Sequence, residues 1–139
     1  MDDESHARRI LEQARTIAVL GIHHDLERPA AYVPAYLAEV GYRVRGVNPA
    51  LVGRELLGHR VVASLAELGE PIDVVDVFRR AELVPGHLDD LLAANPKVVW
   101  LQLGIRNDEV AAALRARGVE VIQDRCMLAD HKRFGIPPR

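Results

Sequence analysis

Short apolar runs rich in β-branched residues recur along the chain, and each is followed by a turn and a stretch of helical character. This alternation predicts parallel strands joined by helices. The runs at 16–20 and 97–101 are nearly continuous in apolar residues, which is typical of central strands covered on both faces. The run at 43–47 alternates more, so we expect it to be less buried. The five predicted strands are 16–20, 43–47, 73–77, 97–101 and 120–122.

The residues that flank the intervening segments predict where helices begin and end. Pro29 suits the first turn of a helix, and Gly41 suits a helix end. Ser64 and Glu67 have the spacing of a capping box, and Asn107 is placed to cap a later helix. The predicted helices span about 5–13, 29–40, 64–69, 83–94, 107–117 and 126–132.

Right-handed connections between these elements predict an α/β fold, a Rossmann-like, doubly wound, parallel five-stranded sheet with helices on both faces. We expect the strand order 3-2-1-4-5. The 139 residues suit one hydrophobic core, so residues 1–139 are expected to form a single domain. Within it, residues 1–15 add an N-terminal helix and residues 135–139 form an extended tail. In such sheets a ligand binds beyond the carboxyl ends of the strands, beside the first strand.

Composition narrows the classes of partner. The chain is 49% hydrophobic and 27% charged, which is typical of a folded globular protein. A net charge of −2 and 4% aromatic residues argue against a nucleic-acid or membrane partner. The single cysteine, Cys126, excludes an internal disulfide, and no apolar run suits a signal peptide or membrane helix. A cytoplasmic location is therefore expected.

The turn after the first predicted strand resembles a nucleotide site but departs from two standard ones. Gly21 permits a tight turn, and the helix that follows offers free N–H groups to an anion. The dinucleotide fingerprint G-x-G-x-x-G fails, because His23 and Leu26 occupy its second and third glycine positions. The second strand ends in Asn48 rather than the acidic residue typical of NAD enzymes. Walker A is absent as well, which excludes a P-loop kinase or ATPase.

Basic residues follow two of the predicted strands. Arg79 and Arg80 come after Phe78 at the carboxyl end of the third strand, and Arg28 lies in the loop after the first. Three guanidinium groups placed in this way could converge on phosphates, beside an adenine slot lined by Phe78. The alternative is that Arg79 and Arg80 are solvated and pair with Glu82 or open the next helix.

Other candidates for chemistry carry weaker signals. Adjacent histidines such as His23 and His24 usually diverge, and no cluster has a compelling metal-ligand spacing, so no metal is predicted. Cys126 could serve as a nucleophile near Arg125 or His131, but an inert thiol fits as well. No G-x-S-x-G elbow or Ser/His/Asp order supports acyl transfer. The sequence therefore predicts no catalytic residue and leaves open whether the protein is an enzyme.

Five segments together resemble a known family. They are IAVLG (17–21), GYRV (41–44) leading to VNP (47–49), DVVDVFRR (73–80), VVWLQLG (98–104) and DRC (124–126). Over about residues 10–134 the chain resembles the small stand-alone CoA-binding domain proteins, which are similar to the amino-terminal CoA-binding domain of the succinyl-CoA synthetase α subunit.

The resemblance implies a site for coenzyme A or a short acyl-CoA, with the phosphates near the loop after the first strand. The family usually has a small residue at the position of His23, and the ligase domain that carries a phosphorylated histidine has no counterpart here. We therefore expect binding without ligase chemistry. The contacts implied by position come from Gly21, Ile22, His23, Arg28, Asn48, Pro49, Phe78, Arg79, Arg80 and Gln102.

Two other functions stay open at this point. One is an NAD(P)-dependent reductase in which Arg45 or Arg79 meets the 2′-phosphate and Cys126 or His23 takes part in the chemistry. The other is an interaction subunit with a vestigial nucleotide site. The sequence leaves open the acyl group, the protein partner and the oligomeric state.

Overall fold

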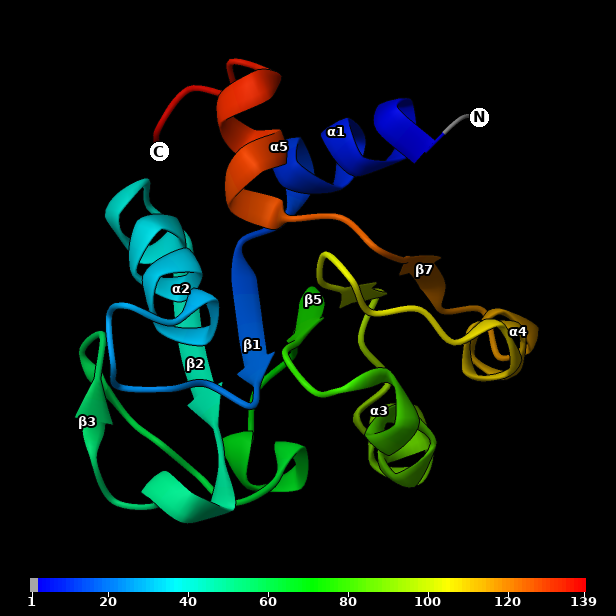
Figure 1. Cartoon of the computed structure of the whole chain (residues 1–139), viewed down its shortest axis with the longest axis horizontal. Coiled ribbons are helices and arrows are strands. Elements are labelled where there is room, and N and C mark those ends of the chain that lie inside the picture. The colour runs from blue at the N-terminus through cyan, green and yellow to red at the C-terminus, as the bar shows by residue number, and fades with distance from the viewer. Residues whose placement is uncertain (1–2) are drawn as a thin grey trace.

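The computed structural model describes residues 3–139, and its centre is a five-stranded parallel sheet (Figure 1). The five strands correspond to the five predicted runs, so the predicted α/β class is confirmed. In the chain, a separate antiparallel pair of two-residue strands comes between the second and third of these strands. The strands of the main sheet are β1 (Thr16–Leu20), β2 (Arg43–Val47), β5 (Val74–Val77), β6 (Val98–Leu101) and β7 (Glu120–Ile122), and the small pair is β3 (Glu55–Leu56) and β4 (His59–Arg60).

The order of strands in the main sheet is β2-β1-β5-β6-β7. In the numbering of the predicted strands this is 2-1-3-4-5, so the predicted order 3-2-1-4-5 is wrong. The third predicted strand, β5, pairs with β1, with Ile17 opposite Val74. All four residues of β5 are buried, as an interior strand requires, whereas β2 begins exposed. Beyond β2 the chain forms an isolated parallel bridge between Val47 and Val62 in place of a strand.

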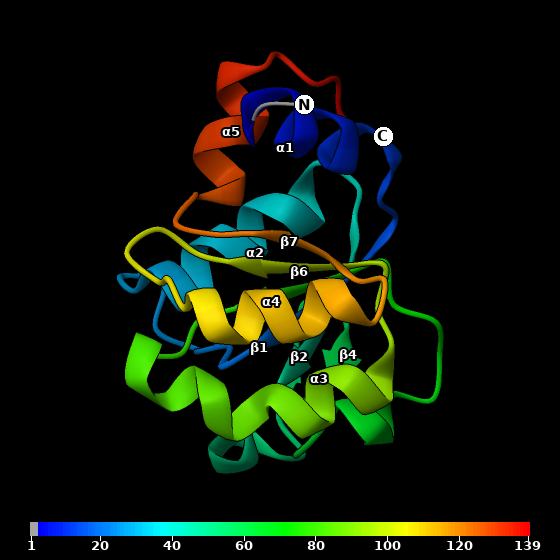
Figure 2. The same ribbon diagram turned by 90° about the vertical axis from the view of Figure 1, so that its right-hand side faces the viewer.

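Helices cover both faces of the sheet and give the molecule three layers (Figures 1 and 2). Ile10, Leu37 and Met127 belong to the apolar cluster on one face, and Leu91 and Leu114 belong to the cluster on the other. The first face is covered by α1 (Asp3–Gln13), α2 (Pro29–Glu39) and α5 (Met127–Arg133), and the second by α3 (Leu88–Ala94) and α4 (Asp108–Ala116). No helix within residues 3–139 is long and apolar enough to cross a bilayer.

Most of the predicted helix ends are confirmed. The Asn107 side chain accepts a hydrogen bond from the Val110 N–H at 2.9 Å, and the Glu67 carboxylate accepts one from the Ser64 N–H at 3.2 Å. The helix predicted at 83–94 differs, because it divides into a 3₁₀ segment, η3 (Ala81–His87), and α3. Pro85 lies inside η3 and has no N–H to donate, which disfavours a continuous α-helix there. Two further 3₁₀ helices are η1 (Pro49–Leu51) and η2 (Leu65–Leu68).

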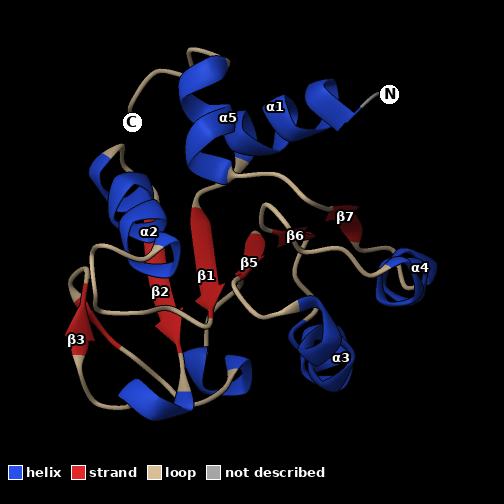
Figure 3. Cartoon of the chain, viewed as in Figure 1, coloured by secondary structure: helices blue, strands red, loops and turns tan. Residues whose placement is uncertain are grey.

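The arrowheads of β1 and β2 point to the same end of the sheet (Figure 3). Because all five strands are parallel, their carboxyl ends and the turns that follow them lie at this end. The predicted site residues are therefore brought to one edge of the molecule by the topology.

Candidate functional site

Gly21 lets two strand ends approach closely. Its φ of +93° lies in the left-handed region, and a Cβ added there would stand 2.5 Å from the carbonyl oxygen of Phe78. The Gly21 N–H donates to the Val47 carbonyl at 2.8 Å, and the Phe78 N–H donates to the Leu20 carbonyl at 2.9 Å. The turns after β1 and β5 are thus held against each other, and Arg79 directly follows this contact.

A cavity of about 490 Å³ opens at this edge of the sheet. Its volume falls within the range of roughly 300–1,000 Å³ that is typical of small-molecule sites. Three segments form its walls: the start of α2, the turn after β5 and the turn after β6. The lining residues are Arg28, Pro29, Ala30, Phe78, Arg79, Arg80, Ala81, Glu82, Leu103, Gly104 and Ile105.

The structure brings the three predicted arginines to this one cavity. The Nε atoms of Arg28 and Arg80 lie 3.9 and 3.6 Å from carboxylates of Asp25 and Glu82, and all four side chains are exposed. Exposed ion pairs at such distances are weak and are easily replaced by a ligand. The predicted alternative, a pairing of arginine with Glu82, therefore holds for Arg80 without removing it from the cavity wall.

Arg79 has a different partner. Its Nε donates a hydrogen bond to Nε2 of His87 at 3.3 Å. Desolvation, followed by the nearby Arg79 charge, lowers the pKa of His87, so its imidazole is neutral at pH 7. A neutral acceptor orients the guanidinium and leaves its positive charge uncompensated. Sequence reasoning missed His87, because no motif links it to Arg79 and η3 brings the two together.

A second cavity, of about 230 Å³, adjoins the first at Arg79, which lines both. It lies between the ends of β1 and β2 and is lined by Leu20, Gly21, Val47, Asn48, Pro49, Ala50, Arg79 and His87. Together the two cavities form an extended space for a ligand at the carboxyl ends of four neighbouring strands, β2, β1, β5 and β6.

Asn48 joins the loop after β1 to the loop after β2. Its Nδ2 donates to the Ile22 carbonyl at 2.8 Å, and its Oδ1 accepts from the Ala50 N–H at 2.9 Å. The Ile22 side chain is buried and packs so closely over Gly46 that a Cβ there would lie 2.9 Å from it. Ile22 and Asn48 therefore shape the second cavity, with the Ile22 side chain in the core.

His23 and His24 stack on each other, with ring centroids 4.6 Å apart, instead of diverging as expected. The Nδ1 of His23 accepts a hydrogen bond from the Asp25 N–H at 3.0 Å, which tightens the loop before α2. Desolvation and the charge of Arg28 lower the pKa of His23. Within residues 3–139, no three His, Cys, Asp or Glu side chains are grouped to hold a metal ion.

Gln102 is buried beneath the cavities rather than exposed to them. Its Nε2 donates a hydrogen bond to Oδ1 of Asp76 at 2.7 Å. Burial raises the pKa of Asp76 to about 8, against the opposing effect of this hydrogen bond, so the carboxyl group is largely protonated at pH 7. Sequence reasoning did not single out Asp76, although an acidic residue within the apolar run of β5 was a usable signal.

Cys126 lies directly before α5 and is half-buried against the apolar cluster that contains Met127. This placement suits the inert thiol that the sequence left open as one of two alternatives.

Comparison with known proteins shows the family of this chain. The family model described as "CoA binding domain" matches residues 15–132, which include every strand of the sheet. The chain belongs to this CoA-binding domain family. The resemblance found in the sequence is therefore confirmed at the level of the family.

Individual relatives agree with the fold. The Bacillus subtilis protein YneT is 35% identical over 128 residues, which cover 92% of this chain and 93% of YneT. The solved structure of cell-free ID.343 from Thermus thermophilus is 52% identical, with a TM-score of 0.91, and covers 96% of this chain and 98% of its own. A hypothetical protein from Pyrococcus horikoshii is 33% identical, with a TM-score of 0.87, over 96% of this chain and 92% of its own.

Proposed function

We propose that this protein binds coenzyme A or a short acyl-CoA at the carboxyl ends of β1, β2, β5 and β6, without catalysis of its own. The observation that carries the proposal is the convergence of Arg28, Arg79 and Arg80 on one cavity at the start of α2. Membership of the CoA-binding domain family supports this ligand.

The charge and geometry of the larger cavity suit the phosphates of the ligand. Guanidinium groups bind phosphate through paired, charge-assisted hydrogen bonds. Within residues 3–139 no side chain caps the start of α2. Pro29 has no N–H and the Ala31 N–H already donates to the Arg28 carbonyl at 2.9 Å, so the helix offers an anion the Ala30 N–H and the positive end of its dipole. We assign the phosphates to Arg28, Arg79, Arg80 and the start of α2, and place Phe78 against the adenine or pantetheine part.

The remaining predicted residues act mainly by shaping the site. Gly21 and Pro49 line the second cavity, and Asn48 ties the loop after β2 to the loop after β1. His23 holds the loop that leads into α2, through its hydrogen bond to Asp25. We assign Ile22 and Gln102 to the support of the backbone around the ligand.

Calorimetric titration of the ligand-stripped protein with CoA, NAD⁺ and NADPH in identical buffer tests the proposal. CoA is expected to bind with a micromolar or lower Kd, and the nicotinamide cofactors are not. At 100 times its Kd, CoA should add about 2.7 kcal/mol to the free energy of unfolding. Acetyl-CoA incubated with the protein should stay intact.

The other outcomes favour the two alternative functions. Binding of NAD⁺ or NADPH in place of CoA would point to a reductase. If none of the three cofactors binds or stabilises the protein, the site is vestigial and an interaction subunit is the better reading.

A further inference from the structure

The turn after β6 presents an apolar side chain inside the arginine-lined cavity. Leu103 is 70% exposed and lines the cavity together with Ile105. The Ile105 N–H donates to the Gln102 carbonyl at 2.8 Å, which closes a tight turn with Leu103 at its tip. Gly104 has a φ of +84°, the left-handed conformation that such a turn can require at its third residue. The turn therefore has a defined shape.

Both sides of this turn are anchored to the body of the protein. On one side, the buried Gln102 side chain is bonded to Asp76 at 2.7 Å. On the other, the Asp124 carboxylate accepts a hydrogen bond from the Gly104 N–H at 2.6 Å, and the Asp124 N–H donates to the Ile105 carbonyl at 3.1 Å. Leu103 is thus held in place at the wall of the cavity.

Asp124 makes these two bonds from an uncommon backbone conformation. Its φ is +56°, a region that residues with a side chain seldom occupy. The two hydrogen bonds to the turn are made from this conformation, which Asp adopts more readily than most residues with a side chain.

The cavity therefore has a basic side and an apolar side. The start of α2 and the turn after β5 supply Arg28, Arg79 and Arg80, whereas the turn after β6 supplies Leu103 and Ile105. The arginines suit phosphate, but a phosphate gains nothing from a leucine side chain. An apolar side chain held in solvent gains free energy when an apolar part of a ligand covers it. The complete occupant should therefore carry an apolar group as well as its phosphates.

We propose that Leu103 and Ile105 contact the acyl group of a short-chain acyl-CoA, so that the site binds an acyl-CoA with an apolar tail more tightly than free CoA. Leu103 is the main specificity-determining residue. This inference rests on the proposed binding of CoA and adds the class of acyl group to it.

Titration with CoA, acetyl-CoA, butyryl-CoA and hexanoyl-CoA tests this inference. Each methylene group that becomes buried against Leu103 should tighten binding by about two- to fourfold, until the chain outgrows the apolar wall. In Leu103→Ser the ratio of the affinities for hexanoyl-CoA and CoA should fall to near one. Leu26→Ser is a matched control, because Leu26 is 67% exposed but lies outside this cavity. Its affinity ratio should equal that of the wild type.

The outcomes separate the two proposals. If the wild type binds CoA and its affinity does not change along the acyl series, CoA binding stands and the acyl contact is wrong. If Leu103→Ser weakens all four ligands equally, Leu103 contacts the common pantetheine part, and its role in acyl specificity is wrong. If the wild type binds none of the four ligands, both proposals are wrong.

Discussion

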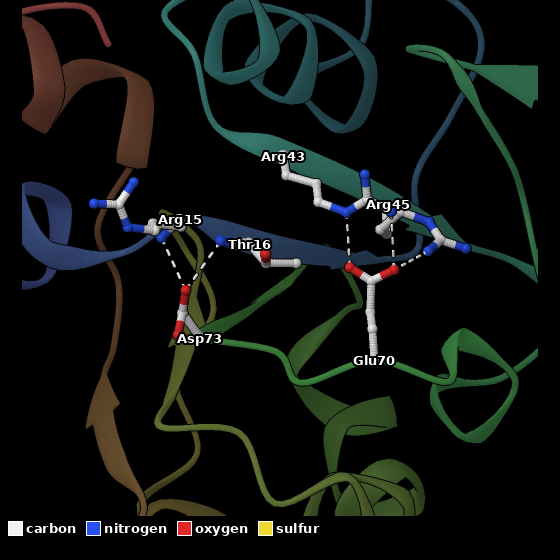
Figure 4. A network of polar contacts seen from close by, with 6 residues as sticks. All are labelled: Arg15, Thr16, Arg43, Arg45, Glu70 and Asp73. Carbon is white, nitrogen blue, oxygen red and sulfur yellow. Dashed lines mark hydrogen bonds and ion pairs between the residues drawn. The ribbon is translucent and has the colours of Figure 1, made fainter.

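The arginine side chains at the two ends of the sheet are paired differently. At the carboxyl end, Arg28 and Arg80 lie 3.9 and 3.6 Å from exposed carboxylates, and Arg79 is held by the neutral His87. At the amino end, the Glu70 carboxylate accepts hydrogen bonds from Arg43 at 2.8 and 3.0 Å and also pairs with Arg45 (Figure 4).

Asp73, also at the amino end, is likewise fully paired, and the cavity at this end is much smaller than the one at the carboxyl end. Asp73 accepts hydrogen bonds from the N–H groups of Arg15 and Thr16 at 2.9 and 3.0 Å (Figure 4). It also pairs with Lys97 at 3.3 Å. The cavity beside it measures about 70 Å³, against about 490 Å³ at the carboxyl end. The charged side chains at the amino end are paired with each other, and these pairs stabilise the fold. The arginines at the carboxyl end have weak or neutral partners beside a large cavity, so they are available to an external anion. The two ends thus divide stability and binding between them.

Gly21→Ala should have the largest effect, because it disrupts the close contact between the turns after β1 and β5 at the carboxyl end of the sheet. The added Cβ would stand 2.5 Å from the Phe78 carbonyl oxygen and 3.3 Å from Cδ of Arg79. We expect a loss of about 3 kcal/mol or more in the free energy of unfolding, measured by urea denaturation, together with weaker CoA binding.

Gly53→Ala is the matched control. Gly53 also has a left-handed φ, of +87°, but a Cβ there would meet nothing within 4 Å. The free energy of unfolding of this variant should fall by only about 1–2 kcal/mol, which is the cost of placing a side chain in the left-handed conformation. The variant should bind CoA as the wild type does. Equal losses in the two variants would contradict the role of the Gly21–Phe78 contact.

The combined variant Arg79→Ala, Arg80→Ala tests the binding half of the comparison. Each lost charge-assisted bond to phosphate should weaken CoA binding by about tenfold, and the pair by about a hundredfold, measured by calorimetry. Its melting temperature should stay close to that of the wild type, because both side chains are exposed. Arg43→Ala should do the reverse, with lower stability and unchanged affinity. If both variants have the same affinity for CoA, the arginines at the carboxyl end do not bind the phosphates.

The sequence predicted local structure well where the responsible residues are neighbours in the chain. Asn107 and Val110, or Ser64 and Glu67, are three residues apart, so their spacing alone indicates the helix start. Strand order depends instead on contacts between distant segments. Nothing local in 73–77 shows that β5 pairs with β1. Its valines, Val74, Val75 and Val77, do fall on both faces of the strand, which suits an interior strand better than the edge position that was predicted.

The same distinction applies to the site. Arg28, Phe78, Arg79 and Arg80 were predictable because parallel strands bring their carboxyl ends to one edge. Which residues face the ligand was harder, since Gln102 follows β6 directly and yet turns inward to Asp76. Leu103 and His87 gave no motif, because their placement depends on a tight turn and on a 3₁₀ segment.

Glu70→Gln should have the smallest effect and sharpens the stability half of the comparison. The hydrogen bond from Arg43 holds the pKa of Glu70 below its ordinary value of 4.5, with desolvation opposing it. An acid whose pKa is lowered by folding adds stability above its unfolded pKa, and this contribution disappears as the pH falls through the folded pKa. We therefore expect the variant to be about 1 kcal/mol less stable than the wild type at pH 7 in urea denaturation, and the difference to shrink as the pH falls below 4.5. Because the network lies at the end of the sheet remote from the arginine cavity, the affinity for CoA at pH 7 should be the same in both proteins. A weaker affinity in Glu70→Gln would mean that the two ends are energetically coupled, and the division of stability and binding between them would then be wrong.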